Sequence, residues 1–281
     1  MLEALFLGLI QGLTEFLPIS SSAHIRIIGA FWSNAEDPGA TFTAITQIGT
    51  ELAVLFYFRN QIASILRAWV LTLVSKSFRT KASAEEKSDA RLGTYVIIGS
   101  IPIVILGYLF QDTIRSTFRT LWLIAIVLIV FSLILGAVDK YGRSEKTLEK
   151  LSAKHSIYYG LAQCLALIPG VSRSGATISA GRLLGYERKD ALRLSFFLAI
   201  PAVLGSGLYE LKTALTEPAT NELFTMTQTL AATVVAFVVG YAVIAWLMKF
   251  VSTKSFAPFV IYRICLGTAL LIALATGVIS A

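Results

Sequence analysis

The stretches Gln11-Gly-Leu-Thr-Glu15-Phe-Leu-Pro18-Ile-Ser20-Ser-Ser-Ala-His24 and Gln163-Cys-Leu-Ala-Leu-Ile-Pro169-Gly-Val-Ser172-Arg173-Ser174-Gly-Ala-Thr177 interrupt an otherwise apolar chain. Each stretch places hydroxyl groups and ionisable side chains next to a proline, between long hydrophobic segments. Such groups are costly in hydrocarbon, so a cluster of them indicates a functional site.

The two stretches resemble each other at a constant offset of 152 positions (163 − 11). About one chance identity is expected over such a window, and the observed identities are more numerous. The pattern predicts two copies of one unit, each supplying half of a shared site. The identical pairs are Gly8/Gly160, Leu9/Leu161, Gln11/Gln163, Leu13/Leu165, Ser20/Ser172 and Ser22/Ser174.

The composition is that of an integral membrane protein. Of the 281 residues, 56% are hydrophobic, and the mean hydropathy is +0.73. A soluble domain of this length is much less apolar. The net charge of +7 arises from basic residues between apolar segments, without the basic stripe that a nucleic acid backbone requires, so we expect no nucleic acid partner. Residues 1–281 are expected to form a single membrane domain.

Six segments are apolar enough to span a bilayer. The stretches Leu2–Ile28 and Ile157–Leu184 differ from them, because each is broken by a proline and a serine-rich segment. This pattern is typical of a re-entrant helix pair. We therefore predict an all-α polytopic fold with two repeats, about 1–139 and 155–281, each a re-entrant pair followed by three transmembrane helices. The predicted spans are Thr41–Phe58, Thr94–Phe110, Leu121–Val138, Leu194–Tyr209, Met226–Met248 and Pro258–Ile279.

An odd number of spans in each repeat predicts that the second copy is inverted relative to the first. Basic residues number seven in the 59–91 loop and five in the 139–155 loop, against Arg115 and Arg119 in one alternate loop and Lys212 in the other. The positive-inside rule places the two basic loops in the cytoplasm and the site at the outer face.

The first basic loop contains apolar residues at helical spacing, which predicts an amphipathic helix on the inner membrane surface. The charged run Lys76–Arg91 that follows is interpreted as a solvated loop rather than a binding patch. The apolar positions are Ile62, Ile65, Leu66, Trp69, Val70 and Leu73.

The first polar stretch contains the components of an activated nucleophile. Glu15 lies four residues after Gln11, and His24 lies three residues after Ser21. A hydroxyl, an imidazole and a carboxylate can together form a nucleophile with a general base. Helix capping by a serine is the structural alternative, but capping does not explain Glu15 and His24 at membrane depth.

The second polar stretch suits an anion. Ser172, Arg173 and Ser174 follow Pro169-Gly and open a helix, so backbone N–H groups, hydroxyls and a guanidinium can converge on a phosphate. Arg173 could instead extend to the membrane interface. Together the two stretches suggest chemistry on a phosphorylated lipid, in which positioning and charge neutralisation dominate.

Both motifs resemble the two signatures of the undecaprenyl-diphosphate phosphatase family of the bacitracin-resistance type. The similarity extends along the chain, including Gln47-Ile-Gly-Thr-Glu51 and Pro258-Phe-x-Ile-Tyr-Arg263. The resemblance implies a bacterial inner-membrane enzyme that removes the terminal phosphate of undecaprenyl diphosphate at the outer face. Such an enzyme recycles the carrier lipid for peptidoglycan synthesis and confers bacitracin resistance.

The resemblance also implies roles for individual residues. Ser21 is the candidate nucleophile, His24 the candidate acid–base group or alternative nucleophile, and Glu15 the activating carboxylate. Arg173 completes the catalytic candidates. Residues implied to bind the substrate are Gln11, Ser20, Ser22, Ser172, Ser174 and Thr177.

The family motif accepts Glu or Gln at its first acidic position, where this chain has Gln11. An amide cannot act as a carboxylate base and binds a hard cation weakly. Family activity is supported by Mg²⁺ or Ca²⁺. Gln11 and Glu15 are possible metal ligands, but we expect the diphosphate to supply most of the ligands of the ion.

Gln47, Glu51 and Gln163 are possible walls of the site, although Glu51 could equally pair with a neighbouring helix. Arg263 could be a site wall or an interface anchor.

The alternative function is a flippase or transporter of phosphorylated polyprenyl lipids, because inverted repeats with broken helices are a transporter plan. Translocation needs no nucleophile, and Ser21 beside Glu15 and His24 favours the enzyme. A structural scaffold would leave Arg173 and Glu15 without a role. We expect a polyprenyl diphosphate substrate, membrane lipid around the protein, and a possible homodimer.

Overall fold

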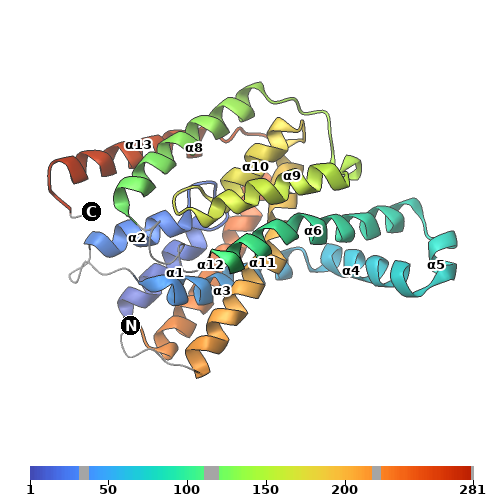
Figure 1. Cartoon of the computed structure of the whole chain (residues 1–281), viewed down its shortest axis with the longest axis horizontal. Coiled ribbons are helices and arrows are strands. Elements are labelled where there is room, and N and C mark those ends of the chain that lie inside the picture. Colours follow the sequence, from blue (N-terminus) through green and yellow to red (C-terminus); the bar gives the residue numbers. More distant parts are fainter. Residues whose placement is uncertain (32–37, 111–119, 217–222, 280–281) are drawn as a thin grey trace.

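The computed structural model describes residues 1–31, 38–110, 120–216 and 223–279, and these residues form helices joined by short loops (Figure 1). Arg115 and Arg119, which enter the charge count above, lie outside the described residues. The α-helices are α1 (Leu2–Thr14), α2 (Ser21–Phe31), α3 (Gly39–Tyr57), α4 (Arg59–Val74), α5 (Lys76–Lys81), α6 (Ala84–Leu109), α8 (Leu121–Tyr141), α9 (Ala153–Cys164), α10 (Arg173–Leu183), α11 (Arg188–Thr216), α12 (Met226–Val251) and α13 (Ala257–Ala275). Two short 3-10 helices, η2 (Leu148–Lys150) and η3 (Leu165–Leu167), complete the elements.

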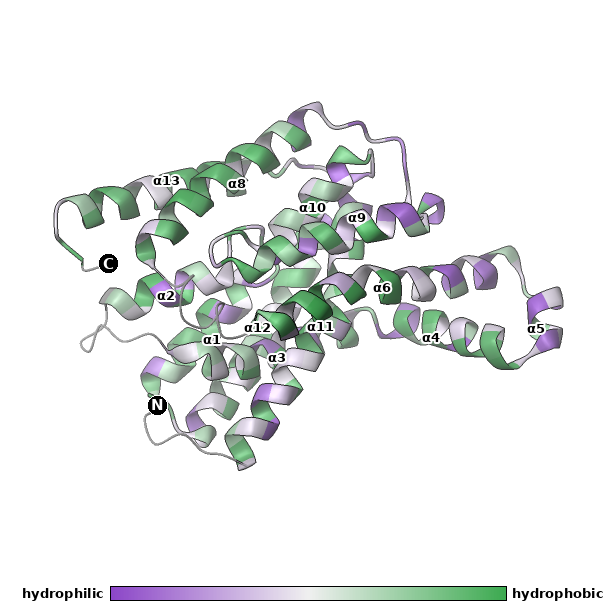
Figure 2. Cartoon of the chain, in the orientation of Figure 1, coloured by the Kyte–Doolittle hydropathy of each residue, from purple (hydrophilic) through white to green (hydrophobic). Residues whose placement is uncertain are grey.

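Five helices of the described chain are long and apolar enough to cross a membrane: α6, α8, α11, α12 and α13. Hydrophobic residues predominate along α8 and α13 in the colouring of Figure 2. The prediction of an all-α polytopic membrane protein is confirmed. The sixth predicted span corresponds to α3, which has 19 residues but is not among the five. Its apolar character is reduced by threonines, by the half-buried Gln47 and by the buried Glu51.

Each predicted re-entrant segment is a pair of short helices separated by a loop. The helices α1 and α2 have 13 and 11 residues, and α9 and α10 have 12 and 11. A single helix needs about 20 residues to span the hydrocarbon core. None of the four can therefore cross it alone, and their loops meet inside the protein.

Equivalent glycines allow these short helices to pack closely. A Cβ atom at Gly8 of α1 would collide with the carbonyl oxygen of Ala232 on α12. A Cβ atom at Gly160 of α9 would collide in the same way with the carbonyl oxygen of Gly99 on α6. Glycine is the residue that permits such a backbone approach. The two copies of the sequence repeat thus contact their partner helices in the same manner.

An aromatic contact anchors the first loop in the core. Phe16, adjacent to Glu15, is fully buried and packs edge to face on Phe196 of α11, with ring centroids 5.3 Å apart. Aromatic pairs of this geometry stabilise a fold beyond the effect of area burial. The backbone at Glu15 is therefore held against the second half of the chain.

The first basic loop is more helical than the sequence indicates. The predicted amphipathic helix is present as α4, which packs on α6 and exposes Leu66, Leu73 and Val74. The interpretation of Lys76–Arg91 as a loop was wrong, because this run forms α5 and the start of α6. A reciprocal capping box between Ser83 and Glu86 explains why α6 begins ten residues before the apolar segment. The exposed, polar character expected of the run is present (Figure 2).

Candidate active site

The loops of the two re-entrant pairs share one unusual backbone conformation. Ser20 and Ser172 have φ values of 72° and 69°, and they are the two non-glycine residues with positive φ in the described chain. In each loop this serine caps the following helix, since its Oγ accepts a hydrogen bond from the backbone N–H of Ala23 or Gly175. A left-handed non-glycine residue costs about 1–3 kcal/mol, and such strain clusters at functional sites.

The hydroxyl groups are duplicated as well. Ser20 Oγ lies 3.2 Å from Ser22 Oγ, and Ser172 Oγ lies 3.1 Å from Ser174 Oγ. The residue between each pair differs: Ser21 in the first loop and Arg173 in the second. The same local frame thus presents a hydroxyl from one half of the chain and a guanidinium from the other.

Arg263 of α13 joins the two loops. It is fully buried and donates to the carbonyl oxygens of Pro18 at 3.1 Å, Gly170 at 2.8 Å and Val171 at 3.1 Å. Pro18 and Gly170 occupy equivalent positions of the repeat, 152 residues apart (170 − 18). Arg263 is therefore neither an interface anchor nor a wall of the cavity but the connection between the loops, a role that its sequence position could not reveal.

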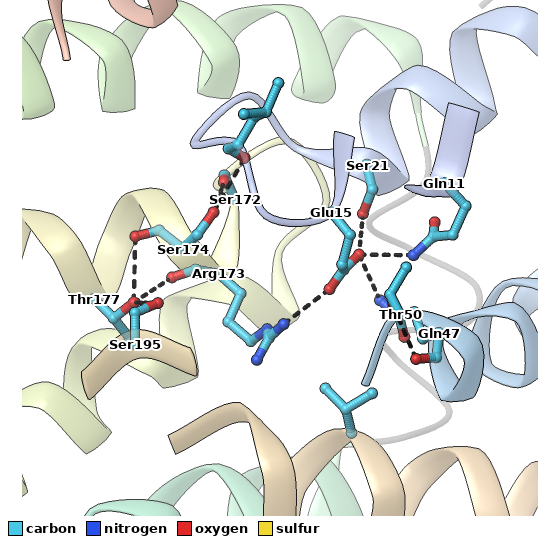
Figure 3. A network of polar contacts seen from close by, with 12 residues as sticks. Gln11, Glu15, Ser21, Gln47, Thr50, Ser172, Arg173, Ser174, Thr177 and Ser195 are labelled. Carbon is cyan, nitrogen blue, oxygen red and sulfur yellow. Dashed lines mark hydrogen bonds and ion pairs between the residues drawn. The ribbon is translucent and has the colours of Figure 1, made fainter. Parts of the chain in front are cut away.

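Glu15 is the centre of the polar network (Figure 3). Its Oε2 accepts hydrogen bonds from Ser21 Oγ at 2.6 Å, Gln11 Nε2 at 2.8 Å and Gln47 Nε2 at 3.4 Å. Its Oε1 accepts from Arg173 Nη2 at 2.9 Å. A buried carboxylate is tolerated only when it is paired and hydrogen-bonded in this way.

Arg173 reaches into the first half of the chain from the start of α10. Its side chain is 13% exposed and forms an ion pair with Glu15, so it does not extend to the membrane interface. Its Nη1 has no hydrogen-bond partner in the described chain. The guanidinium therefore retains free donors beside a carboxylate, as expected for a group that meets an anionic ligand.

Ser21 is the hydroxyl best placed to act as a nucleophile. It is the first residue of α2, where backbone N–H groups favour negative charge, and its hydroxyl donates to Glu15 at 2.6 Å. A carboxylate at this distance can accept the hydroxyl proton. The candidate nucleophile and the candidate base are thus already in contact.

His24 points away from Ser21. Its Nδ1 lies 2.7 Å from the carbonyl oxygen of Ser20, and its Nε2 lies 2.7 Å from the hydroxyl of Tyr262. Because a carbonyl can only accept, Nδ1 donates, and Nε2 accepts from Tyr262 in the neutral ring. Of the three groups that the first motif brings together in sequence, only Ser21 and Glu15 are in contact. Tyr262, from the closing motif, is the partner that the sequence did not reveal.

A cavity of about 550 Å³ opens beside this network. Its lining combines the polar groups Glu15, Ser21 and Arg173 with apolar residues such as Ile103, Val104 and Val203. Such a combination suits a ligand with a charged head and a hydrocarbon chain. Further lining residues are Ser20, Ser22, Gln47, Tyr108, Leu167, Ser172, Ser206, Tyr209 and Glu210.

Several candidates from the sequence do not line this cavity. Thr177 is fully buried and donates to the carbonyl of Arg173 at 2.8 Å, while Ser174 donates to the carbonyl of Leu17 at 3.1 Å. Gln163 is buried without a hydrogen-bond partner in the described chain. Thr177 and Ser174 therefore support the loops rather than face this cavity. Glu51 and Gln11 are buried and do not line the cavity either.

The residues present do not form a preorganised metal site. In the part of the chain that the structure describes, no three His, Cys, Asp or Glu side chains surround a common point. Both oxygens of Glu15 already accept hydrogen bonds, and one of them is held by the guanidinium of Arg173. Gln11 and Glu15, which the sequence offered as possible metal ligands, therefore do not form a metal site by themselves.

Comparison with known proteins shows the family to which the chain belongs. The model of the family described as bacitracin resistance protein BacA matches residues 4–269. A protein named undecaprenyl-diphosphatase from Micrococcus luteus is 56% identical to this chain, over 100% of this chain and 99% of the relative. A protein of the same name from Arthrobacter sp. is also 56% identical, over 99% of this chain and 96% of the relative. A protein of the same name from Thermobifida fusca is 54% identical over 99% of this chain and 92% of its own. The chain belongs to the BacA family of bacitracin resistance proteins.

Proposed function

We propose that this protein is an undecaprenyl-diphosphate phosphatase. The observation that carries the proposal is the 2.6 Å hydrogen bond from the Ser21 hydroxyl to Glu15, beside Arg173 at the wall of a partly apolar cavity. The relatives that share its whole length bear this name. The product, undecaprenyl phosphate, returns to peptidoglycan synthesis, and removal of the diphosphate lowers the amount of lipid available to bacitracin.

In the proposed reaction, Ser21 Oγ attacks the terminal phosphorus as Glu15 accepts the hydroxyl proton. A bond forms between Ser21 and phosphorus, and the bond from phosphorus to the bridging oxygen breaks. Undecaprenyl phosphate leaves with the electron pair of that bond. Arg173 neutralises charge on the phosphoryl oxygens, which is the main catalytic contribution in phosphoryl transfer. Glu15 then releases its proton to water in the cavity and accepts another proton from the water molecule that attacks phosphorus. The bond from phosphorus to Ser21 Oγ breaks, Ser21 Oγ takes this proton from Glu15, and inorganic phosphate leaves.

The apolar part of the cavity suits the prenyl chain. Ile103 and Val104 of α6 and Val203 of α11 line it, and Val104 is 53% exposed on the apolar surface of α6. A lipid could therefore extend from the polar groups into the bilayer between α6 and α11. Ser20, Ser22 and Ser172 lie beside the diphosphate in this arrangement.

We further propose that Mg²⁺ or Ca²⁺ enters with the diphosphate, which supplies most of its ligands. The engagement of both oxygens of Glu15 with Ser21, Gln11, Gln47 and Arg173 is the observation behind this assignment. A hard divalent cation prefers phosphate and water oxygens and would reduce the charge on the leaving phosphate.

The two halves are proposed to be inverted repeats with the site open to the outer face of the cell membrane. The equivalent φ angles of Ser20 and Ser172, and the equivalent contacts of Gly8 and Gly160, support duplication. In Figure 1, α5 and the segment between α8 and α9 lie toward the right of the view, whereas the start of α1 and the end of α13 lie toward the left. Placement of both basic segments at one end agrees with the positive-inside rule.

Phosphate release by the detergent-purified protein, with undecaprenyl diphosphate as substrate, tests the activity. The wild type is expected to release one phosphate per lipid, and Ser21→Ala is the matched inactive control. Transport of the lipid across vesicles without phosphate release would instead establish the flippase alternative. The possible homodimer is tested separately, by the mass of the protein–detergent particle.

A further inference from the structure

Glu51 is a buried acid that the proposed reaction does not use. Glu51 lies on α3, one helical turn after Gln47, and is 1% exposed. Both of its carboxyl oxygens lack a hydrogen-bond partner in the described part of the chain. Glu15, also buried, accepts four hydrogen bonds close by. Two acids in one site thus have opposite surroundings.

The charged groups that act on Glu51 are Glu15 and Arg173. The guanidinium of Arg173 is already bonded to Glu15 at 2.9 Å and does not reach Glu51 as a donor. Charged residues on the helices packed against α3 are engaged elsewhere or lie near helix ends. Arg59 donates to the carbonyl oxygen of Phe56, and Arg193 donates to Gln61. Glu210 accepts a hydrogen bond from Thr41, and Lys249 lies in the last turn of α12.

An ionised carboxylate without a donor is strongly disfavoured in a dry interior, and the group stays neutral instead. Glu15 has donors for both oxygens and a guanidinium, so it remains ionised. The polar network beside Ser21 then carries one negative carboxylate, one guanidinium and one neutral carboxyl. When the surroundings of two neighbouring acids differ in this way, one acid is ionised and the other stays protonated.

We propose that Glu51 is a positioning residue that must keep its proton for the diphosphate to bind. This inference rests on the proposed function and extends it. While Glu51 is neutral, Glu15 is the one ionised carboxylate of the network around Arg173 that the substrate meets. When ionised, it adds a second negative charge behind Glu15, competes for Arg173 and repels the diphosphate. Glu51 thereby sets the alkaline limit of substrate binding.

The first test compares the pH dependence of the KM for undecaprenyl diphosphate in wild type, Glu51→Gln and Glu51→Met. Above the pH at which Glu51 ionises, the wild-type KM is expected to rise about tenfold per pH unit, while kcat changes little. Glu51→Gln keeps the shape of the neutral acid, and Glu51→Met keeps the volume without polar atoms. Both variants should show wild-type KM at neutral pH and lose the alkaline rise.

Glu187→Gln is the matched control, because Glu187 is exposed on the segment between α10 and α11 and its substitution removes the same charge. Its profile should equal that of the wild type. An alkaline rise that persists in both Glu51 variants would overturn the proposal. Folded variants that are inactive at every pH would overturn it too, because Glu51 would then act as an ionised base or cation ligand.

A second readout does not require turnover. Infrared difference spectra of the wild type between neutral and alkaline pH should show loss of a protonated carboxyl band, and this band should be missing in Glu51→Gln. A band that is unchanged in Glu51→Gln contradicts the proposal even if the enzyme is active. Failure of wild-type phosphate release would contradict the proposed function, while the infrared result would still decide the protonation of Glu51.

Discussion

Arg173 donates to Glu15 at 2.9 Å although 158 residues separate them in the chain. The pair joins the two re-entrant loops at the wall of the cavity, with Ser21 bonded to the other oxygen of the same carboxylate. A diphosphate that attracts Arg173 would leave Glu15 with its hydroxyl donor and without its cation. In the proposed reaction, substrate binding would therefore increase the basicity of Glu15 at the point where it accepts the Ser21 proton.

Ser21 and Ser22 provide a matched test of the nucleophile. Ser21→Ala should lower phosphate release on the order of 10⁴-fold, because it removes the attacking oxygen. Ser22→Ala removes one hydroxyl contact with Ser20, worth about 1 kcal/mol, and should cost less than about tenfold. The measurement is the initial rate with purified protein. Similar losses in both variants would show that the serines act structurally.

Arg173→Lys tests whether the planar guanidinium is needed. Lysine keeps the positive charge but cannot hold Glu15 and a phosphoryl oxygen through one fork. We expect kcat/KM to fall on the order of 100-fold, nearly as far as in Arg173→Ala. Activity close to that of the wild type in Arg173→Lys would show that the site requires only a point charge.

His24 is expected to orient the first loop rather than attack phosphorus. His24→Asn can still donate to the Ser20 carbonyl, whereas His24→Ala cannot. The asparagine variant should therefore retain clearly more activity than the alanine variant. Tyr262→Phe should resemble the asparagine variant. Equal and complete inactivation by both His24 substitutions, with the fold intact, would favour direct participation of the imidazole.

Arg263→Met should destabilise the protein. It leaves the carbonyl oxygens of Pro18, Gly170 and Val171 buried without this donor, at roughly 1–3 kcal/mol each. Thermal unfolding in detergent should detect the loss, and the exposed Arg67→Met on α4 serves as the control. Equal unfolding temperatures for the two variants would contradict the role of Arg263 as the connection between the loops.

The proposed topology predicts opposite labelling of two exposed lysine positions. In a background without Cys164 and Cys265, Lys212→Cys should react with a membrane-impermeant thiol reagent added to intact cells. Lys81→Cys on α5 should react only after the membrane is opened. Labelling of Lys81→Cys from outside would reverse the orientation, and labelling of neither position would call for other reporter sites.

The membrane class, the broken helices and the polar motifs were predictable from the sequence, because each depends on residues close together in the chain. Hydrophobic length determines which segments can span, and a proline followed by serines marks where a helix must break. The pairing of Ser20 with Ser172 was also predictable, because a constant offset of 152 residues preserves local conformation. The helical start of α6 was not predicted, because the charged run around Ser83 was interpreted as a loop and its capping box was overlooked.

The tertiary structure alone decided which polar groups meet. His24 lies three residues from Ser21 but faces Tyr262, which is 238 residues away, because the helix that carries it turns its imidazole toward α13. Arg263 joins two loops that are remote from it in sequence, and Glu51 becomes an acid without a donor only when α3 packs in the core. Sequence spacing fixes the face of a helix on which a side chain lies, whereas the partner on that face depends on how distant helices pack.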